Sequence, residues 1–83
     1  MLSEASRATV QKARLIYESQ LREKLEQESR DQFACIEPTS GQYFLGSTFD
    51  AAVNAAIDAY PDRLSHTIRI GYSAALHLGV LVQ

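Results

Sequence analysis

The chain has 83 residues, of which 46% are hydrophobic and 22% charged, and this balance is that of a globular domain and excludes a disordered or membrane segment. A chain of this length buries only roughly 60% of the surface that its unfolded form exposes, so one thin core is expected. Cys35 is the single cysteine, which excludes an internal disulfide. We therefore expect one domain over residues 1–83 that gains stability from self-association.

The formal net charge is −2, and basic residues do not cluster. Residues 31–83 contain Arg63 and Arg69 as their only cations, against five acidic residues. This pattern disfavours nucleic acid as a partner. No apolar run approaches the ~20 residues of a membrane span, and the N-terminus does not resemble a secretory signal. Together with the lone thiol, these features predict a cytoplasmic protein.

Residues 1–30 are predicted to form an amphipathic helix, since residues 3–30 contain neither proline nor glycine. Its apolar side chains recur at steps of three and four and form one stripe. The stripe consists of Val10, Ala13, Tyr17, Leu21 and Leu25.

Two arrangements of this stripe are open: it packs on the chain's own sheet, or part of it packs on a second chain. Leu15 and Ile16 widen the apolar surface and favour a homodimer. The candidate interface residues are Val10, Tyr17, Leu21, Leu25 and Tyr72.

A β-hairpin is predicted next. Residues 33–37 alternate with a period of two, the turn residues 38–41 follow, and residues 43–45 return as a second strand. Tyr43 and Phe44 are expected on opposite faces of this hairpin, where either one of them is exposed as an interface anchor or both are covered by helices on the two faces.

Residues 47–50 resemble a capping box, and a second helix is predicted from there to Tyr60, ended by Pro61. A further strand is predicted where apolar and polar residues alternate. Its apolar-face positions are Leu64, His66, Ile68 and Ile70. The apolar residues 74–82 are predicted to form another strand. The fold class is therefore α+β: a long N-terminal helix followed by β-β-α-β(-β), with two helices on a small, mainly antiparallel sheet.

A metal site or small active site using His66, His77 and Cys35 is the first alternative function. A two-residue turn at Gly71–Tyr72 would align the two histidines, whereas a three-residue loop would separate them. A third ligand would have to be Cys35 or Glu37. We expect ordinary, partly buried histidines, a structural cysteine, no cofactor, no metal and no catalytic residue.

Nucleic-acid binding through the basic residues near the start of the chain is the second alternative. It would use Arg7, Lys12 and Arg14. Tyr72, at the tip of a turn, is instead the residue most expected to be exposed for contact with a partner.

Residues 33–46, Phe-Ala-Cys-Ile-Glu-Pro-Thr-Ser-Gly-Gln-Tyr-Phe-Leu-Gly, and residues 69–72, Arg-Ile-Gly-Tyr, carry a resemblance. With Ile-Tyr-Glu at 16–18, they resemble a family of short bacterial and cyanobacterial proteins usually described as hypothetical. The resemblance spans about residues 13–79, although Asp31 and Gln32 stand where a glycine often precedes the first strand. It implies a stand-alone prokaryotic protein, encoded beside small partners such as retropepsin-like aspartic proteases in cassettes that resemble toxin–antitoxin pairs.

The function expected from the sequence is therefore a homodimeric, non-catalytic protein-interaction module. It would regulate a partner encoded nearby, as the antitoxin-like half of a two-gene cassette.

Overall fold

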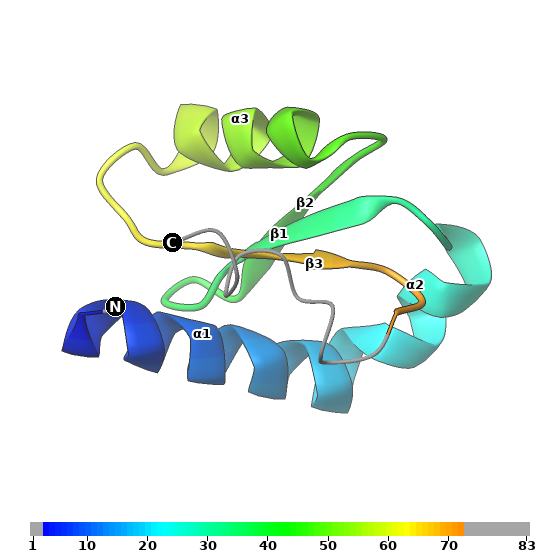
Figure 1. Ribbon diagram of the computed structural model, residues 1–83, viewed down its shortest axis with the longest axis horizontal. Coiled ribbons are helices and arrows are strands. Elements are labelled where there is room, and N and C mark those ends of the chain that lie inside the picture. Colours follow the sequence, from blue (N-terminus) through cyan, green and yellow to red (C-terminus); the bar gives the residue numbers. More distant parts are fainter. Residues whose placement is uncertain (1–2, 73–83) are drawn as a thin grey trace.

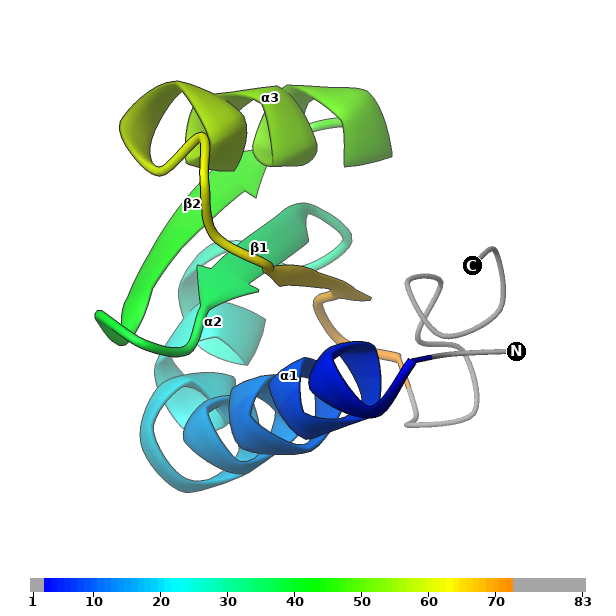
Figure 2. The same cartoon turned by 90° about the vertical axis from the view of Figure 1, so that its left-hand side faces the viewer.

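A three-stranded antiparallel sheet separates two helical layers in the computed structural model, which describes residues 3–72 (Figure 1). One face of the sheet is covered by the long N-terminal helical segment and the other by a single shorter helix. The strand order is β2-β1-β3, with β1 in the centre (Figure 2). The predicted α+β class, with a long helix before a hairpin, a second helix and a further strand, is confirmed.

The N-terminal segment consists of α1 (Glu4–Ile16), the π-helix η1 (Tyr17–Leu21) and α2 (Arg22–Glu28). The Ser3 side chain caps α1, because its hydroxyl accepts a hydrogen bond of 3.0 Å from the backbone N–H of Ser6. The predicted helix is thus present over most of its length, but a π turn interrupts it.

The spacing of the apolar stripe explains the π turn. Ala13, Tyr17, Leu21 and Leu25 follow one another in steps of four, and each step rotates the helix about 40° past a full turn. Three such steps would turn Leu25 about 120° away from Ala13. In η1 the backbone N–H of Arg22 bonds to the carbonyl of Tyr17, which widens the turn and removes part of this drift. Tyr17 and Leu25 therefore both reach the core.

The hairpin is formed by β1 (Phe33–Glu37) and β2 (Gln42–Gly46), with Glu37 opposite Gln42 and a four-residue loop between them. This confirms the predicted hairpin. β3 (His66–Arg69) pairs antiparallel with the other edge of β1, placing Arg69 opposite Phe33.

The second helix, α3 (Phe49–Ala59), begins at Thr48, whose hydroxyl accepts a hydrogen bond of 3.1 Å from the backbone N–H of Ala51. The predicted capping box began one residue earlier, at Ser47, and this detail was wrong. The helix packs closely on the end of β2: a Cβ atom added to Gly46 would lie 2.5 Å from the backbone nitrogen of Ala52. Glycine at position 46 therefore lets the backbones of β2 and α3 approach each other.

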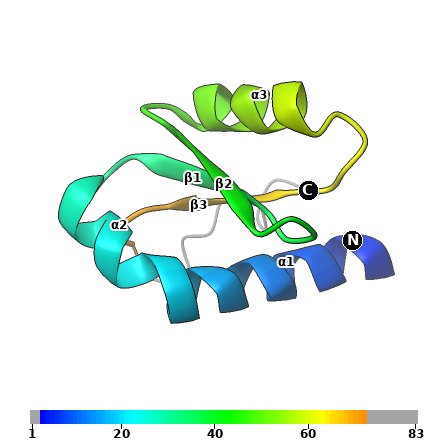
Figure 3. The same cartoon turned by 180° about the vertical axis from the view of Figure 1, so that it is seen from behind.

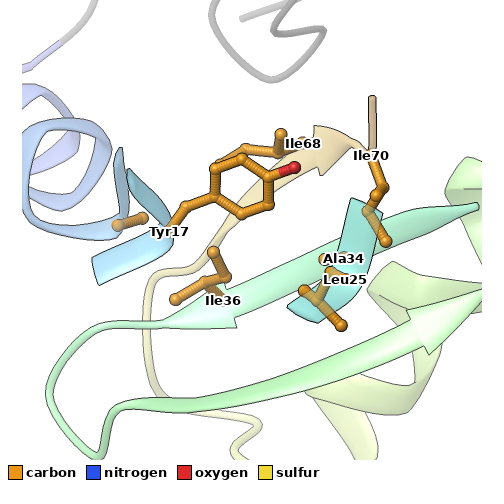
Figure 4. Close-up of a cluster of buried hydrophobic side chains, with 7 residues drawn as sticks. Tyr17, Leu25, Ala34, Ile36, Ile68 and Ile70 are labelled. Atoms are coloured by element: carbon orange, nitrogen blue, oxygen red, sulfur yellow. The ribbon is translucent and has the colours of Figure 1, made fainter. Parts of the chain in front are cut away.

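The main core lies between α1, α2 and the sheet. In Figure 4 the Tyr17 ring lies among Ile36 and Ile68, with Ile70 and Leu25 further along the same face. Burying one such aliphatic side chain contributes roughly 1.5–3 kcal/mol relative to leaving it exposed. Burial also raises the pKa of the Tyr17 hydroxyl, an effect that the backbone of Gly71 partly opposes, so this phenol stays neutral.

A smaller cluster lies between the sheet and α3, built from Cys35, Ala52 and Ala56 with Phe33 and Phe44 packed against it. Its small side chains let α3 lie close to β1 and β2, whereas the same helix contacts β3 much less.

The strand β3 starts later than the sequence predicted. Leu64 was expected on the buried face of the last strand, but its residue is 53% exposed because β3 begins only at His66. The predicted strand over residues 74–82 lies outside the described residues.

Candidate functional site

Glu37 is the most buried carboxylate of the described chain, with 1% of its surface exposed. It ends β1, and its side chain folds over the hairpin turn that follows. The backbone N–H groups of Thr39 and Ser40 each donate a hydrogen bond of 2.8 Å to its carboxylate. Arg63, from the connection between α3 and β3, donates a third at 3.1 Å. One carboxylate thus ties the hairpin turn to the α3–β3 connection.

These partners decide the charge of Glu37. Burial alone would raise its pKa, but the hydroxyl and backbone N–H of Ser40, the N–H of Thr39 and the guanidinium of Arg63 lower it more, to about 2. The carboxylate is therefore ionised at neutral pH, and both of its oxygens accept hydrogen bonds. A general base works best with a pKa near the operating pH, so a carboxylate with a pKa of about 2 suits a structural role.

A groove of about 430 Å³ lies beside this cluster, where α1, the hairpin turn and the α3–β3 connection meet. Figure 3 shows the hairpin turn reaching toward the N-terminal half of α1. Lys12, Thr39 and Arg63 are among its lining residues. Arg63 is paired with Glu37, and Asp62 also lines the groove, so the groove does not concentrate charge of one sign.

The two described ligands of the alternative metal site do not come together. Cys35 pairs with Thr67 and lies in the cluster beneath α3, whereas His66 pairs with Ile36, on the face covered by α1. Because alternate residues of a strand point to opposite faces, Cys35 and His66 cannot share one metal ion. His77 lies outside the described residues. Within residues 3–72, no group of three or more side chains has the composition and proximity of a metal site.

Cys35 is buried, and its thiol donates a hydrogen bond of 3.2 Å to the hydroxyl of Ser65. It lies beneath α3, in a cluster with Ala52 and Ala56. A reactive thiol requires access and an electropositive neighbour. Cys35 therefore fits the structural role that the sequence predicted.

The predicted interface residues divide into two groups. Val10, Tyr17 and Leu25 are buried in the chain's own core, and Leu21 packs partly against that core. The stripe therefore follows the first of the two arrangements left open: α1 and α2 use it to cover the sheet. Tyr17 and Leu25 are each 1% exposed and cannot contact a partner in this fold.

Tyr72 is the exception. Its residue is 36% exposed, as expected for the tip of a turn, and its ring lies 4.5 Å from the guanidinium carbon of Arg69. Of the five predicted interface residues, it is the most exposed.

The three basic residues proposed to bind nucleic acid do not form one surface. Arg7 and Arg14 are two helical turns apart on the outer side of α1, each beside acidic neighbours, Glu4 and Glu18 respectively. Lys12 lines the groove on another side of the helix. The mixed charge on this helix is typical of a solvated face.

The structure adds one surface that the sequence alone did not identify, the β2 edge, defined as Gln42–Gly46. β2 borders the sheet, and among the described residues no strand pairs with its outer side (Figure 2). The edge contains no charged residue and no proline, and Leu45 is 39% exposed. The uncharged run from Gly41 to Phe49 was the available signal, but it becomes informative only once β2 is known to lie at a border.

Compared with protein-family models, with curated proteins and with solved structures, the chain has no match. The geometry therefore carries the functional argument. Within the described part of the chain, no helix is both long and apolar enough to span a bilayer.

Proposed function

We propose that the protein is a non-catalytic protein-interaction module that forms a homodimer through the β2 edge. In this proposal the dimer acts in the cytoplasm, where it binds and regulates a protein partner encoded nearby, as an antitoxin-like component of a two-gene cassette.

The observation that carries the proposal is the unprotected β2 edge. Natural proteins protect exposed edge strands with charged side chains, proline, bulges or a covering element, because open N–H and C=O groups attract another strand. Tyr43, Phe44 and Leu45 provide none of these devices, and the pairing of β1 with β2 runs through all five β2 residues without a bulge. Two copies related by a two-fold axis could pair β2 with β2 and continue the sheet, which is an isologous interface.

The polar chemistry of the described residues supports a binding role rather than catalysis. Glu37 accepts hydrogen bonds from Thr39, Ser40 and Arg63, and the Cys35 thiol is buried against Ser65. This carboxylate and this thiol are therefore both engaged in holding the fold.

Light scattering at several concentrations tests the homodimer. We expect a solution mass of twice the 9.2 kDa chain for the wild type. Leu45→Lys places a charge on the edge and should give a folded monomer, because a desolvated lysine opposes strand pairing. Leu15→Lys makes the same chemical change on the outer side of α1, where Leu15 is 68% exposed, and should leave the dimer intact.

A monomeric wild type, or a Leu45→Lys variant that stays dimeric, would contradict the proposed interface. The partner is tested separately, by co-expression with the product of the adjacent gene and measurement of the mass of the purified complex. A complex of fixed stoichiometry supports the antitoxin-like role, and independent elution of the two proteins argues against it.

A further inference from the structure

Arg69 lies beside two aromatic rings on the α3 side of the sheet, over β3, which α3 contacts less than it contacts β1 or β2. Its guanidinium carbon lies 5.4 Å from the centre of the Phe33 ring and 4.5 Å from that of the Tyr72 ring. Phe33 is directly across the sheet from Arg69, so strand register supplies one side of the stack.

The other side of the stack comes from a turn. The backbone N–H of Tyr72 bonds to the carbonyl of Arg69 at 3.4 Å, and Gly71 between them has φ +94°, which favours glycine. This turn brings Tyr72 back toward the side chain of Arg69, the first residue of the turn. The guanidinium is therefore fixed by backbone geometry on both sides.

The charge of Arg69 is not neutralised within the described residues. Arg63, the other cation of the segment 31–72, pairs with the carboxylate of Glu37, and Arg30, which packs against Gly71, pairs with Glu26 at 3.5 Å. Arg69 forms no ion pair among residues 3–72, and its Nε is buried there without a hydrogen-bond partner. Residues 73–83 contain no Asp or Glu that could supply an acidic side chain.

A buried donor without a partner is rare in native proteins and calls for an explanation. A guanidinium held by aromatic rings has lost its rotamer freedom before any ligand arrives, so binding would cost less entropy. Its planar edge carries parallel N–H donors that match the two oxygens of a carboxylate. Arginine, tyrosine and phenylalanine are also the residue types enriched at the centres of protein interfaces.

From this geometry we infer that Arg69, between Phe33 and Tyr72, is a recognition site for an Asp or Glu side chain of an acidic protein segment. An apolar neighbour of that carboxylate would pack on the exposed part of the Tyr72 ring. This inference deepens the proposed function by naming the chemistry of the partner, and it rests on that function.

A carboxylate fits this site better than a phosphate chain does. Phosphate sites usually gather several cations or the N–H groups of a helix N-terminus. Residues 31–83 carry five acidic side chains and two cations, Arg63 and Arg69, and Arg63 is paired with Glu37, so the site offers one arginine without an ion pair among residues 3–72. A monovalent carboxylate matches its one charge.

The test is an NMR titration of the full-length protein that follows the side-chain Nε–H resonance of Arg69. The probe is the capped peptide acetyl-Glu-Leu-Glu-Leu-Glu-Leu-amide, with the same peptide carrying Gln in place of Glu as its control, and inorganic phosphate as a competing anion. We expect a saturable shift with the Glu peptide and little change with the Gln peptide or phosphate. Equal shifts with both peptides, or phosphate binding as tightly as the Glu peptide, would overturn the inference.

Two variants at position 69 separate two-point binding of the carboxylate by the guanidinium from attraction by positive charge alone. Arg69→Gln should weaken Glu-peptide binding at least about tenfold, the usual scale for loss of a charge-assisted hydrogen bond. Arg69→Lys keeps the positive charge but lacks the parallel N–H donors of the guanidinium, and should also lose most of the binding. Arg14→Gln removes the same charge from α1 and should change affinity by less than about twofold. Equal weakening by Arg14→Gln and Arg69→Gln would show that only net charge matters.

Backbone amide spectra establish that each variant is folded, and if Arg69→Gln unfolds, the wild-type titration and Arg69→Lys decide the question. The titration reads Arg69 directly and needs no dimer. A titration without binding would therefore not affect the light-scattering test of the β2 edge. A monomeric wild type would likewise not prevent the titration from being interpreted.

Discussion

The face of the sheet that α1 covers is made mainly of large hydrocarbon side chains, whereas the face toward α3 combines small side chains with charged ones. Tyr17, Leu25 and Ile36 are fully buried on the first face. On the second, Cys35 is buried among alanines, and Arg69 remains only partly covered. The same three strands therefore present one surface suited to a core and one that is open to solvent over β3.

This difference follows from strand alternation. Ile36 and Cys35 are neighbours in β1, yet they belong to different clusters because successive side chains point to opposite faces. α3 crosses mainly β2 and β1, so it leaves Arg69 in β3 only partly covered. The comparison suggests that the α1 face supplies most of the stability and leaves the other face free for recognition.

The largest loss of stability is expected when the neighbouring β1 residues Ile36 and Cys35 are each replaced by alanine and compared. Ile36→Ala should lower the free energy of unfolding by about 3 kcal/mol, because it leaves a cavity among packed side chains. Cys35→Ala removes a single sulfur from a cluster of small side chains and should cost about 1 kcal/mol. Urea unfolding of both variants measures the difference. Equal losses would show that the two faces contribute alike.

The next effect is expected for Glu37→Gln, which tests the buried carboxylate that joins the hairpin turn to Arg63. The folded-state pKa of about 2 lies below the ordinary value of 4.5, so ionised Glu37 stabilises the fold above pH 4.5 and this stabilisation is lost as pH falls toward 2. The shift corresponds to about 3 kcal/mol at neutral pH. Glu37→Gln should lose most of that stability and flatten the profile between pH 4.5 and 2.

The matched control is Glu23→Gln on the exposed side of α2, which should leave the profile unchanged. Thermal unfolding followed by circular dichroism from pH 2 to 7 gives both profiles. A Glu37→Gln variant with the same acid dependence as the wild type would show that other carboxylates dominate.

A smaller effect is expected for Gly46→Ala, which sharpens the role of close packing on the α3 face. The added methyl group would collide with the backbone of Ala52 and force α3 away from β2, at a cost of about 2 kcal/mol. Gly41→Ala meets no atom within 4 Å and is disfavoured only by φ +79°, so it should cost about 1 kcal/mol. Urea unfolding measures the loss of unfolding free energy in each variant. A larger loss for Gly46→Ala than for Gly41→Ala would show that steric collision with α3 costs more than backbone strain in the turn.

The smallest effect is expected for deletion of Ser19 from η1. In the shortened chain Leu25 would follow Tyr17 by seven positions instead of eight, close to two regular helical turns, so both side chains should still face the core. We expect a change of less than about 1 kcal/mol. Deletion of Arg14 in the regular part of α1 would rotate Val10 and Ala13 away from the sheet, and that variant should unfold. Comparable damage from both deletions would disprove our explanation of the π turn.

The local pattern of residues determined most of the secondary structure. The turn residues 38–41 between two alternating runs were sufficient for the hairpin, and Pro61 was sufficient to end the second helix. Periodicity also identified the apolar stripe of the first helix. These signals are local, because they depend on backbone preferences over a few neighbouring residues.

Three features were decided only by the tertiary structure. The stripe of Tyr17 and Leu25 covers the chain's own sheet, although its sequence pattern would suit a second chain equally well. β2 became a border strand, and Cys35 and His66 separated onto opposite faces, only when the strand order and register were set. The physical reason is that all three features depend on which helices and strands pack against one another. That packing is determined by contacts between residues far apart in the sequence.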